Sequence, residues 1–93
     1  MSEDAFTIAS TARSRRALTR LPEKVATAAV EFLYESLASS PYRVGKPLKL
    51  GLEGLRSARR GDYRVIYRID DHHRRVTIIA IEHRSDIYRP RPL

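Results

Sequence analysis

The sequence contains no cysteine, which excludes disulfide bonds and thiolate metal sites. It also lacks a long apolar run. The longest, residues 76–81, is interrupted by Thr77 and is far shorter than the ~20 residues that a membrane-spanning helix needs. The N-terminal residues do not follow the order of basic, apolar and small residues that marks a signal peptide. We therefore expect a soluble, cytoplasmic protein.

The motifs of several enzyme classes are missing as well. There is no P-loop, no glycine-rich dinucleotide motif and no nucleophile elbow. The acidic residues Glu53, Asp62 and Glu82 show no partner with which to form a catalytic carboxylate pair. The segment Asp70-Asp71-His72-His73 is a run of neighbours, whereas a zinc site needs three or four converging ligands. The sequence thus predicts neither a metal nor a cofactor.

The composition is that of a small globular protein with excess positive charge. A length of 93 residues indicates one domain, residues 1–93, and a hydrophobic share of 42% is enough for one core. The formal net charge of +7 favours a polyanionic partner, a class that includes nucleic acid, an acidic membrane face and an acidic protein. Arginine, whose planar fork suits phosphate contacts, gathers at residues 13–16, 56–68 and 84–91.

The hydrophobic pattern predicts two helices between one early strand and three late strands. Alternating apolar and polar residues indicate strands, and apolar residues at helical spacing indicate helices. The predicted strands are residues 5–9, 55–60, 63–69 and 75–83, and the predicted helices are residues 11–20 and 23–39. This order predicts an α+β fold (β-α-α-β-β-β). The N-terminal strand and a two-helix hairpin would pack on one face of a small antiparallel sheet.

Arginines are expected on the open face of that sheet. In the strand at residues 63–69, Tyr63 and Val65 fall on one face, and Arg64 and Arg68 fall on the other. Together with basic residues of the preceding strand, these arginines would form a surface able to bind a phosphate backbone. The residues added from that strand are Arg56, Arg59 and Arg60. The alternative is a solvated face on which arginine serves solubility.

A second polar cluster follows the last strand. His83 can transfer protons near neutral pH, and Tyr88 can stack on a base or donate a hydrogen bond. Arg84 and Asp86 lie between them in the sequence. The alternative is an exposed histidine and a tyrosine packed on the sheet edge, and the residues taken alone favour that interpretation.

The segment Arg56-Ser57-Ala58-Arg59-Arg60-Gly61-Asp62-Tyr63-Arg64-Val65-Ile66-Tyr67 resembles the signature of the RelE/ParE toxin superfamily. The closing segment His83-Arg84-Ser85-Asp86-Ile87-Tyr88 does so too. Upstream, the same layout is seen in Leu21-Pro22, Gly45-Lys46-Pro47-Leu48 and Leu52-Glu53-Gly54-Leu55. The resemblance covers residues 6–88 and is greatest to the RelE branch found in actinobacteria.

The resemblance implies the toxin of a type II toxin-antitoxin system, a ribosome-dependent endoribonuclease that cleaves messenger RNA in the A site. In that reaction the ribose 2′-hydroxyl attacks the adjacent phosphate and leaves a cyclic phosphate. The resemblance assigns Arg64 to the scissile phosphate and Tyr88 to the 2′-hydroxyl or to base stacking. It places Arg59, His83 and Arg84 at basic catalytic positions. The expected RNA- and ribosome-binding residues are Arg56, Arg60 and Arg68.

The chain departs from the family at one point that concerns the general base. Some active relatives carry two lysines where this chain has Leu55 and Ser57, and Arg56 substitutes for them only approximately. Arginine is a poor base and a good charge stabiliser. We therefore expect His83 to be the better candidate for proton transfer.

The resemblance also implies partners. These are a cognate antitoxin that covers the basic face, messenger RNA and ribosomal RNA as targets, and operator DNA bound through the antitoxin, with no membrane partner. Two other hypotheses stay open: a ParE-like inhibitor of DNA gyrase without catalytic chemistry, and a non-enzymatic basic module. Arg64, His83, Arg84 and Tyr88 favour the nuclease, and the missing lysines favour the others.

Overall fold

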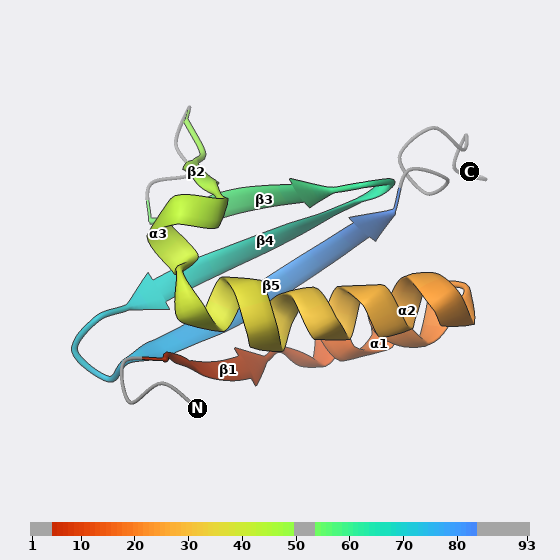
Figure 1. The fold of residues 1–93 in the computed structure, drawn as a ribbon, viewed down its shortest axis with the longest axis horizontal. Coiled ribbons are helices and arrows are strands. Elements are labelled where there is room, and N and C mark those ends of the chain that lie inside the picture. Colours follow the sequence, from red (N-terminus) through yellow and green to blue (C-terminus); the bar gives the residue numbers. More distant parts are fainter. Residues whose placement is uncertain (1–4, 50–53, 84–93) are drawn as a thin grey trace.

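The computed structural model describes residues 5–49 and 54–83. Strand β1 (Thr7–Ser10) leads into a helical hairpin, and three longer strands close the fold (Figure 1). The helical elements are α1 (Ala12–Arg20), α2 (Glu23–Glu31), the π-helix η1 (Phe32–Leu37) and α3 (Pro41–Val44). The remaining strands are β2 (Lys46–Pro47), β3 (Arg56–Arg60), β4 (Tyr63–Asp70) and β5 (Arg75–His83). The predicted α+β class and the order of its main elements are confirmed.

The strands form one 5-stranded sheet in the order β1-β5-β4-β3-β2. β3, β4 and β5 make the predicted antiparallel meander. Contrary to the expectation that it packs on one face of the sheet, β1 forms an edge strand of the sheet and pairs with β5 in the parallel direction. A parallel pair needs a long crossover connection, and the whole chain between β1 and β5 supplies it. Residues 41–47, which none of the predicted elements covers, hold α3 and the edge strand β2.

The helices begin where local chemistry allows them to. Thr11 caps α1, because its Oγ1 accepts a hydrogen bond from the Ser14 backbone N–H at 3.1 Å. The helix predicted over residues 23–39 is confirmed in extent, but it widens into η1, where the Ala38 N–H donates to the Leu33 carbonyl. No helix in residues 5–49 or 54–83 is long and apolar enough to cross a membrane.

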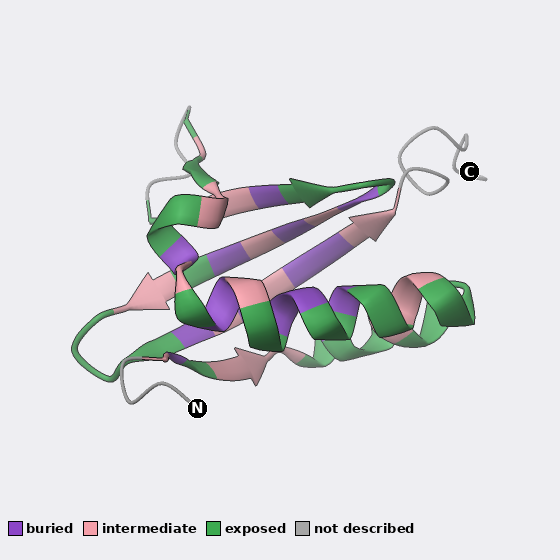
Figure 2. Cartoon of the chain, in the orientation of Figure 1, coloured by how far each residue is buried: buried purple, intermediate pink, exposed green. Residues whose placement is uncertain are grey.

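The core lies between the helical hairpin and one face of the sheet (Figure 2). Its sheet side is built from alternate residues of the central strands, and its helix side includes residues of η1. Fully buried members of the cluster include Leu37, Val65, Tyr67, Val76 and Ile78. The opposite face of the sheet is left to the intervening residues, as the alternation in β4 predicts.

A bulge in β5 changes which side chains reach each face. Ile66 pairs with Ala80 but Tyr67 pairs with Ile78, so Ile79 is the extra residue. The backbone N–H and Oγ1 of Thr11 donate to the carbonyls of Ile78 and Ile79, both at 3.1 Å, and hold β5 at this point. An extra residue moves the following side chains to opposite faces.

Candidate functional site

A row of three charged side chains crosses the open face of the sheet. Arg59 in β3 pairs with Arg64 in β4, and Arg64 pairs in turn with Glu82 in β5. Directly paired residues point to the same face, with Cβ atoms about 4.5–5.5 Å apart. The row therefore holds two neighbouring positive charges, on Arg59 and Arg64, with the Glu82 carboxylate at its end. The two guanidinium groups repel each other in this position.

Arg64 is held by Glu82. Its Nη2 lies 2.5 Å from Glu82 Oε1 and its Nε lies 3.1 Å from the same oxygen. The side chains keep 43% and 36% of their exposure, so water screens the pair and its contribution to stability is at most about 1 kcal/mol. Because a guanidinium carries five N–H donors, three remain for a ligand.

The bulge explains why Glu82 occupies this position. Strict alternation from Val76 and Ile78, which are buried against the helices, would send Glu82 toward the helices and His83 to the open face. After Ile79 the phase is reversed, and Ile81 joins the core instead. The sequence alone shows no partner for Glu82, because only the bulged register brings this residue opposite Arg64.

The predicted arginine surface is therefore divided between two faces. Arg59 and Arg68 are exposed and share the open face with Arg64, and neither has an ion-pair partner among the residues described here. Arg56 and Arg60 pair with Tyr67 and Tyr63, which point toward the helices.

Arg56 holds the chain around α3 in place. Its Nη2 donates to the carbonyls of Tyr42 and Gly45, each at 3.0 Å, and its guanidinium lies 5.2 Å from the centre of the Tyr42 ring. Gly45 sits against the hydroxyl of Tyr67, which donates to the Pro41 carbonyl at 2.6 Å. These contacts leave Arg56 as a structural residue rather than a member of the open face.

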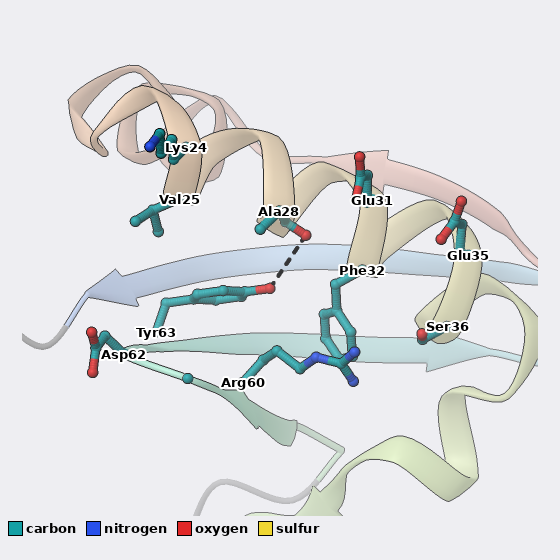
Figure 3. Close-up of a pocket in the computed structure, with 11 residues that line it drawn as sticks. Lys24, Val25, Ala28, Glu31, Phe32, Glu35, Ser36, Arg60, Asp62 and Tyr63 are labelled. Carbon is teal, nitrogen blue, oxygen red and sulfur yellow. Dashed lines mark hydrogen bonds between the residues drawn. The ribbon is translucent and has the colours of Figure 1, made fainter.

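Arg60 lines a groove of about 460 Å³ between α2, η1 and the β3–β4 turn (Figure 3). Its guanidinium lies 5.3 Å from the centre of the Phe32 ring. On the floor of the groove, the Tyr63 hydroxyl donates to the Ala28 carbonyl at 3.4 Å, and burial raises the pKa of Tyr63. The groove mixes apolar and charged side chains, including Glu31 and Glu35, and it lies on the helix side of the sheet.

Of the polar cluster predicted after the last strand, only His83 lies within the described residues. The register pairs His83 with Tyr63, which places His83 on the helix side, away from the row formed by Arg59 and Arg64. Arg84 and Tyr88 lie outside the described residues. Within the described ranges, no group of three or more His, Cys, Asp or Glu side chains is arranged to hold a metal ion.

Comparisons with known proteins agree with the fold. Residues 8–88 match the sequence model of the family described as the ParE toxin of the type II toxin-antitoxin system parDE. Toxin RelE of Mycobacterium tuberculosis is 57% identical over 93 residues, covering 99% of this chain and 96% of that protein. Toxin RelG of the same organism is 50% identical over 84 residues, covering 90% of this chain and 97% of that protein.

Solved structures give the same picture. A chain in the toxin-antitoxin complex RelBE2 of Mycobacterium tuberculosis superposes with a TM-score of 0.84 at 48% identity, covering 86% of this chain and 99% of that one. The isolated Escherichia coli RelE toxin, at 20% identity and a TM-score of 0.70 over 90% of this chain and 92% of that one, shares the fold. The extent of the family match and the identity to RelE confirm the resemblance seen in the sequence: the chain belongs to the ParE toxin family of type II toxin-antitoxin systems and is a RelE-like toxin.

Proposed function

We propose that this toxin is an endoribonuclease that cleaves messenger RNA in the A site of the ribosome. The observation that carries the proposal is the direct pairing of Arg59 with Arg64 on a face that none of the helices in residues 5–49 and 54–83 covers. Two opposed guanidinium groups repel each other, and a phosphate between them would remove that repulsion and be held by several N–H donors. The similarity to Toxin RelE supports this choice of activity.

In this proposal each residue of the site has a separate role in binding or cleaving the RNA. Arg64 contacts the scissile phosphate through the N–H groups that Glu82 does not use, and it stabilises the charge that develops on the phosphate oxygens. Arg59 supplies a second cation at the same phosphate, and Arg68 contacts the RNA backbone further along β4. Tyr88 and Arg84 complete the site by orienting the 2′-hydroxyl and binding the backbone.

A cognate antitoxin is the proposed protein partner. Toxins of similar fold have been solved in RelBE complexes from Mycobacterium tuberculosis and Escherichia coli. A net charge of +7 favours an acidic antitoxin segment, which would cover Arg59 and Arg68 and exclude RNA. The complex would bind operator DNA through the antitoxin, and the toxin would act in the cytoplasm, where ribosomes are.

The test is cleavage on programmed ribosomes, with messenger RNA ends mapped by primer extension. Wild-type toxin is expected to cut at the A-site codon. Arg64→Ala should cut about 10²–10³-fold more slowly, the usual effect of removing one transition-state donor. Arg16→Ala, which removes the same charge from an exposed position of α1, is the matched control and should change the rate by less than about 3-fold. Equal rates for both variants would contradict the role of Arg64.

A gyrase inhibitor is the second candidate, favoured by the ParE description of the matching family. In that case Arg59, Arg64 and Arg68 would bind a protein surface or DNA without chemistry. Folded toxin that cuts no message but blocks DNA supercoiling by purified gyrase would decide for this function. Toxin that cuts the message and leaves supercoiling intact would decide against it.

A further inference from the structure

Glu82 stands where the proposed reaction needs a proton acceptor. In cleavage by a 2′-hydroxyl, the attacking oxygen and the phosphate belong to the same nucleotide. A base must therefore reach the 2′-oxygen while the phosphate contacts its cation. Both contacts of Arg64 fall on Oε1 of Glu82, at 2.5 and 3.1 Å, so Oε2 is not used by Arg64. A phosphate bound to the remaining donors of Arg64 would therefore lie beside Glu82, with its ribose within reach of this oxygen.

Within the described part of the chain, the other side chains on the open face do not suit that role. Arg59, Arg64 and Arg68 are arginines, which do not accept protons under ordinary conditions. Ser57 pairs with Ile66 on the same face and offers only a hydroxyl. His83 is paired with Tyr63 on the helix side, because the bulge at Ile79 has reversed the phase of β5.

We propose that Glu82 is the general base of this toxin and that the bulge in β5 brings it to the catalytic face. The inference rests on the proposed endoribonuclease function. Glu82 Oε2 takes the proton of the 2′-hydroxyl, and the 2′-oxygen attacks its own 3′-phosphate. The bond from phosphorus to the 5′-oxygen of the next nucleotide breaks. The departing oxygen takes a proton from solvent, Glu82 returns its proton to solvent, and the products are a 2′,3′-cyclic phosphate and a 5′-hydroxyl.

Glu82→Gln separates this role from two simpler ones. A glutamine Oε1 still accepts from Arg64 Nε and Nη2, so the orientation of Arg64 is kept, but the amide cannot take the proton. If Glu82 only positions Arg64, the variant should cut at close to the wild-type rate. If Glu82 is only a counter-ion that competes with the phosphate, the variant should bind RNA more tightly and cut as fast or faster.

The measurement is the single-turnover cleavage rate on programmed ribosomes, together with binding of a message whose A-site nucleotide is 2′-deoxy and cannot react. We expect Glu82→Gln to lower the rate at least about 100-fold, the lower range for loss of general base catalysis, without weakening binding of the inert message. Glu35→Gln, which removes the same charge from an exposed position of η1, should match the wild type.

The outcomes are distinct. A Glu82→Gln toxin that cuts within about 3-fold of the wild type overturns the proposal, as does a loss of cutting that follows a proportional loss of binding. A wild-type toxin that does not cut at all overturns the endoribonuclease function itself, and the proposal with it. Thermal melting of each variant shows that the compared proteins are folded. A 100-fold loss at unchanged binding and melting temperature supports Glu82 as the base.

Discussion

Replacement of Gly45 by alanine should destabilise the protein through one identifiable neighbour, the hydroxyl of Tyr67. A Cβ at residue 45 would meet that hydroxyl closer than atoms can approach, and it would lie 2.8 Å from the Ser57 carbonyl oxygen and 3.0 Å from Tyr67 Cζ. The backbone of Gly45 has φ −134, which any residue can adopt, so the penalty comes from contact alone. Overpacking of this kind costs about 1–3 kcal/mol.

Tyr67→Phe should cost about 1–2 kcal/mol for a different reason, because it deletes the 2.6 Å hydrogen bond to the Pro41 carbonyl inside the core. The same deletion removes the atom that would meet a Cβ at residue 45 most closely. The double variant Gly45→Ala/Tyr67→Phe should therefore be more stable than the sum of the single effects predicts, by about 1 kcal/mol. The clash with the Ser57 carbonyl remains, so relief should be partial.

Urea unfolding at equilibrium measures this coupling, provided that the slope m is the same in all four proteins. Thermal melting gives a second readout, since about 1 kcal/mol moves the melting temperature of a domain this size by roughly 4–8 °C. Gly54→Ala is the matched control. Gly54 has φ +86 and no atom within 4 Å of its Cβ position, so its penalty comes from the backbone and should add to that of Tyr67→Phe. Additivity of the Gly45 and Tyr67 effects to within about 0.5 kcal/mol would refute the reasoning.

Three further predictions follow from the other contacts. Arg56→Ala removes hydrogen bonds to two backbone carbonyls and should lower the free energy of unfolding by about 1–3 kcal/mol in urea titrations; an unchanged midpoint would mean that Arg56 is free to bind RNA. Arg68→Ala should leave that midpoint in place but reduce the slope of log affinity for RNA against log salt by about 0.7, and a constant slope would exclude a phosphate contact. The hydrogen bond from the His73 side chain lowers the pKa of Asp70 below its ordinary 3.8. Folding therefore favours the charged carboxylate of Asp70. Its contribution to the stability of the folded protein is present above pH 3.8 and is lost as the pH falls through the lowered pKa. The melting temperature of wild type should exceed that of Asp70→Asn at neutral pH, with the gap closing in acid; a gap that widens in acid would reverse the sign of this linkage.

Local patterns in the chain determined most of the fold and part of the site. The alternation of β4, with Tyr63, Val65 and Tyr67 toward the helices and Arg64 on the other face, was predicted correctly, because side-chain direction in a regular strand depends only on position parity. The first residues of the helices that follow Thr11 and Pro22 were also predictable, because capping and backbone geometry depend on neighbouring residues only. The family signature was likewise a property of the chain and was confirmed by the match over residues 8–88.

Pairing between strands was decided only by the tertiary structure. The parallel direction of β1 and the contact between Arg64 and Glu82 depend on which residues become neighbours across the sheet. Parity within one strand cannot predict a bulge in it. The extra residue at Ile79 exchanges the faces of Glu82 and His83, because each added residue turns every later side chain over. The acid that faces Arg64 was therefore hidden in the sequence, since its face depends on the bulge at Ile79, whose carbonyl accepts a hydrogen bond from Thr11, 68 residues earlier in the chain.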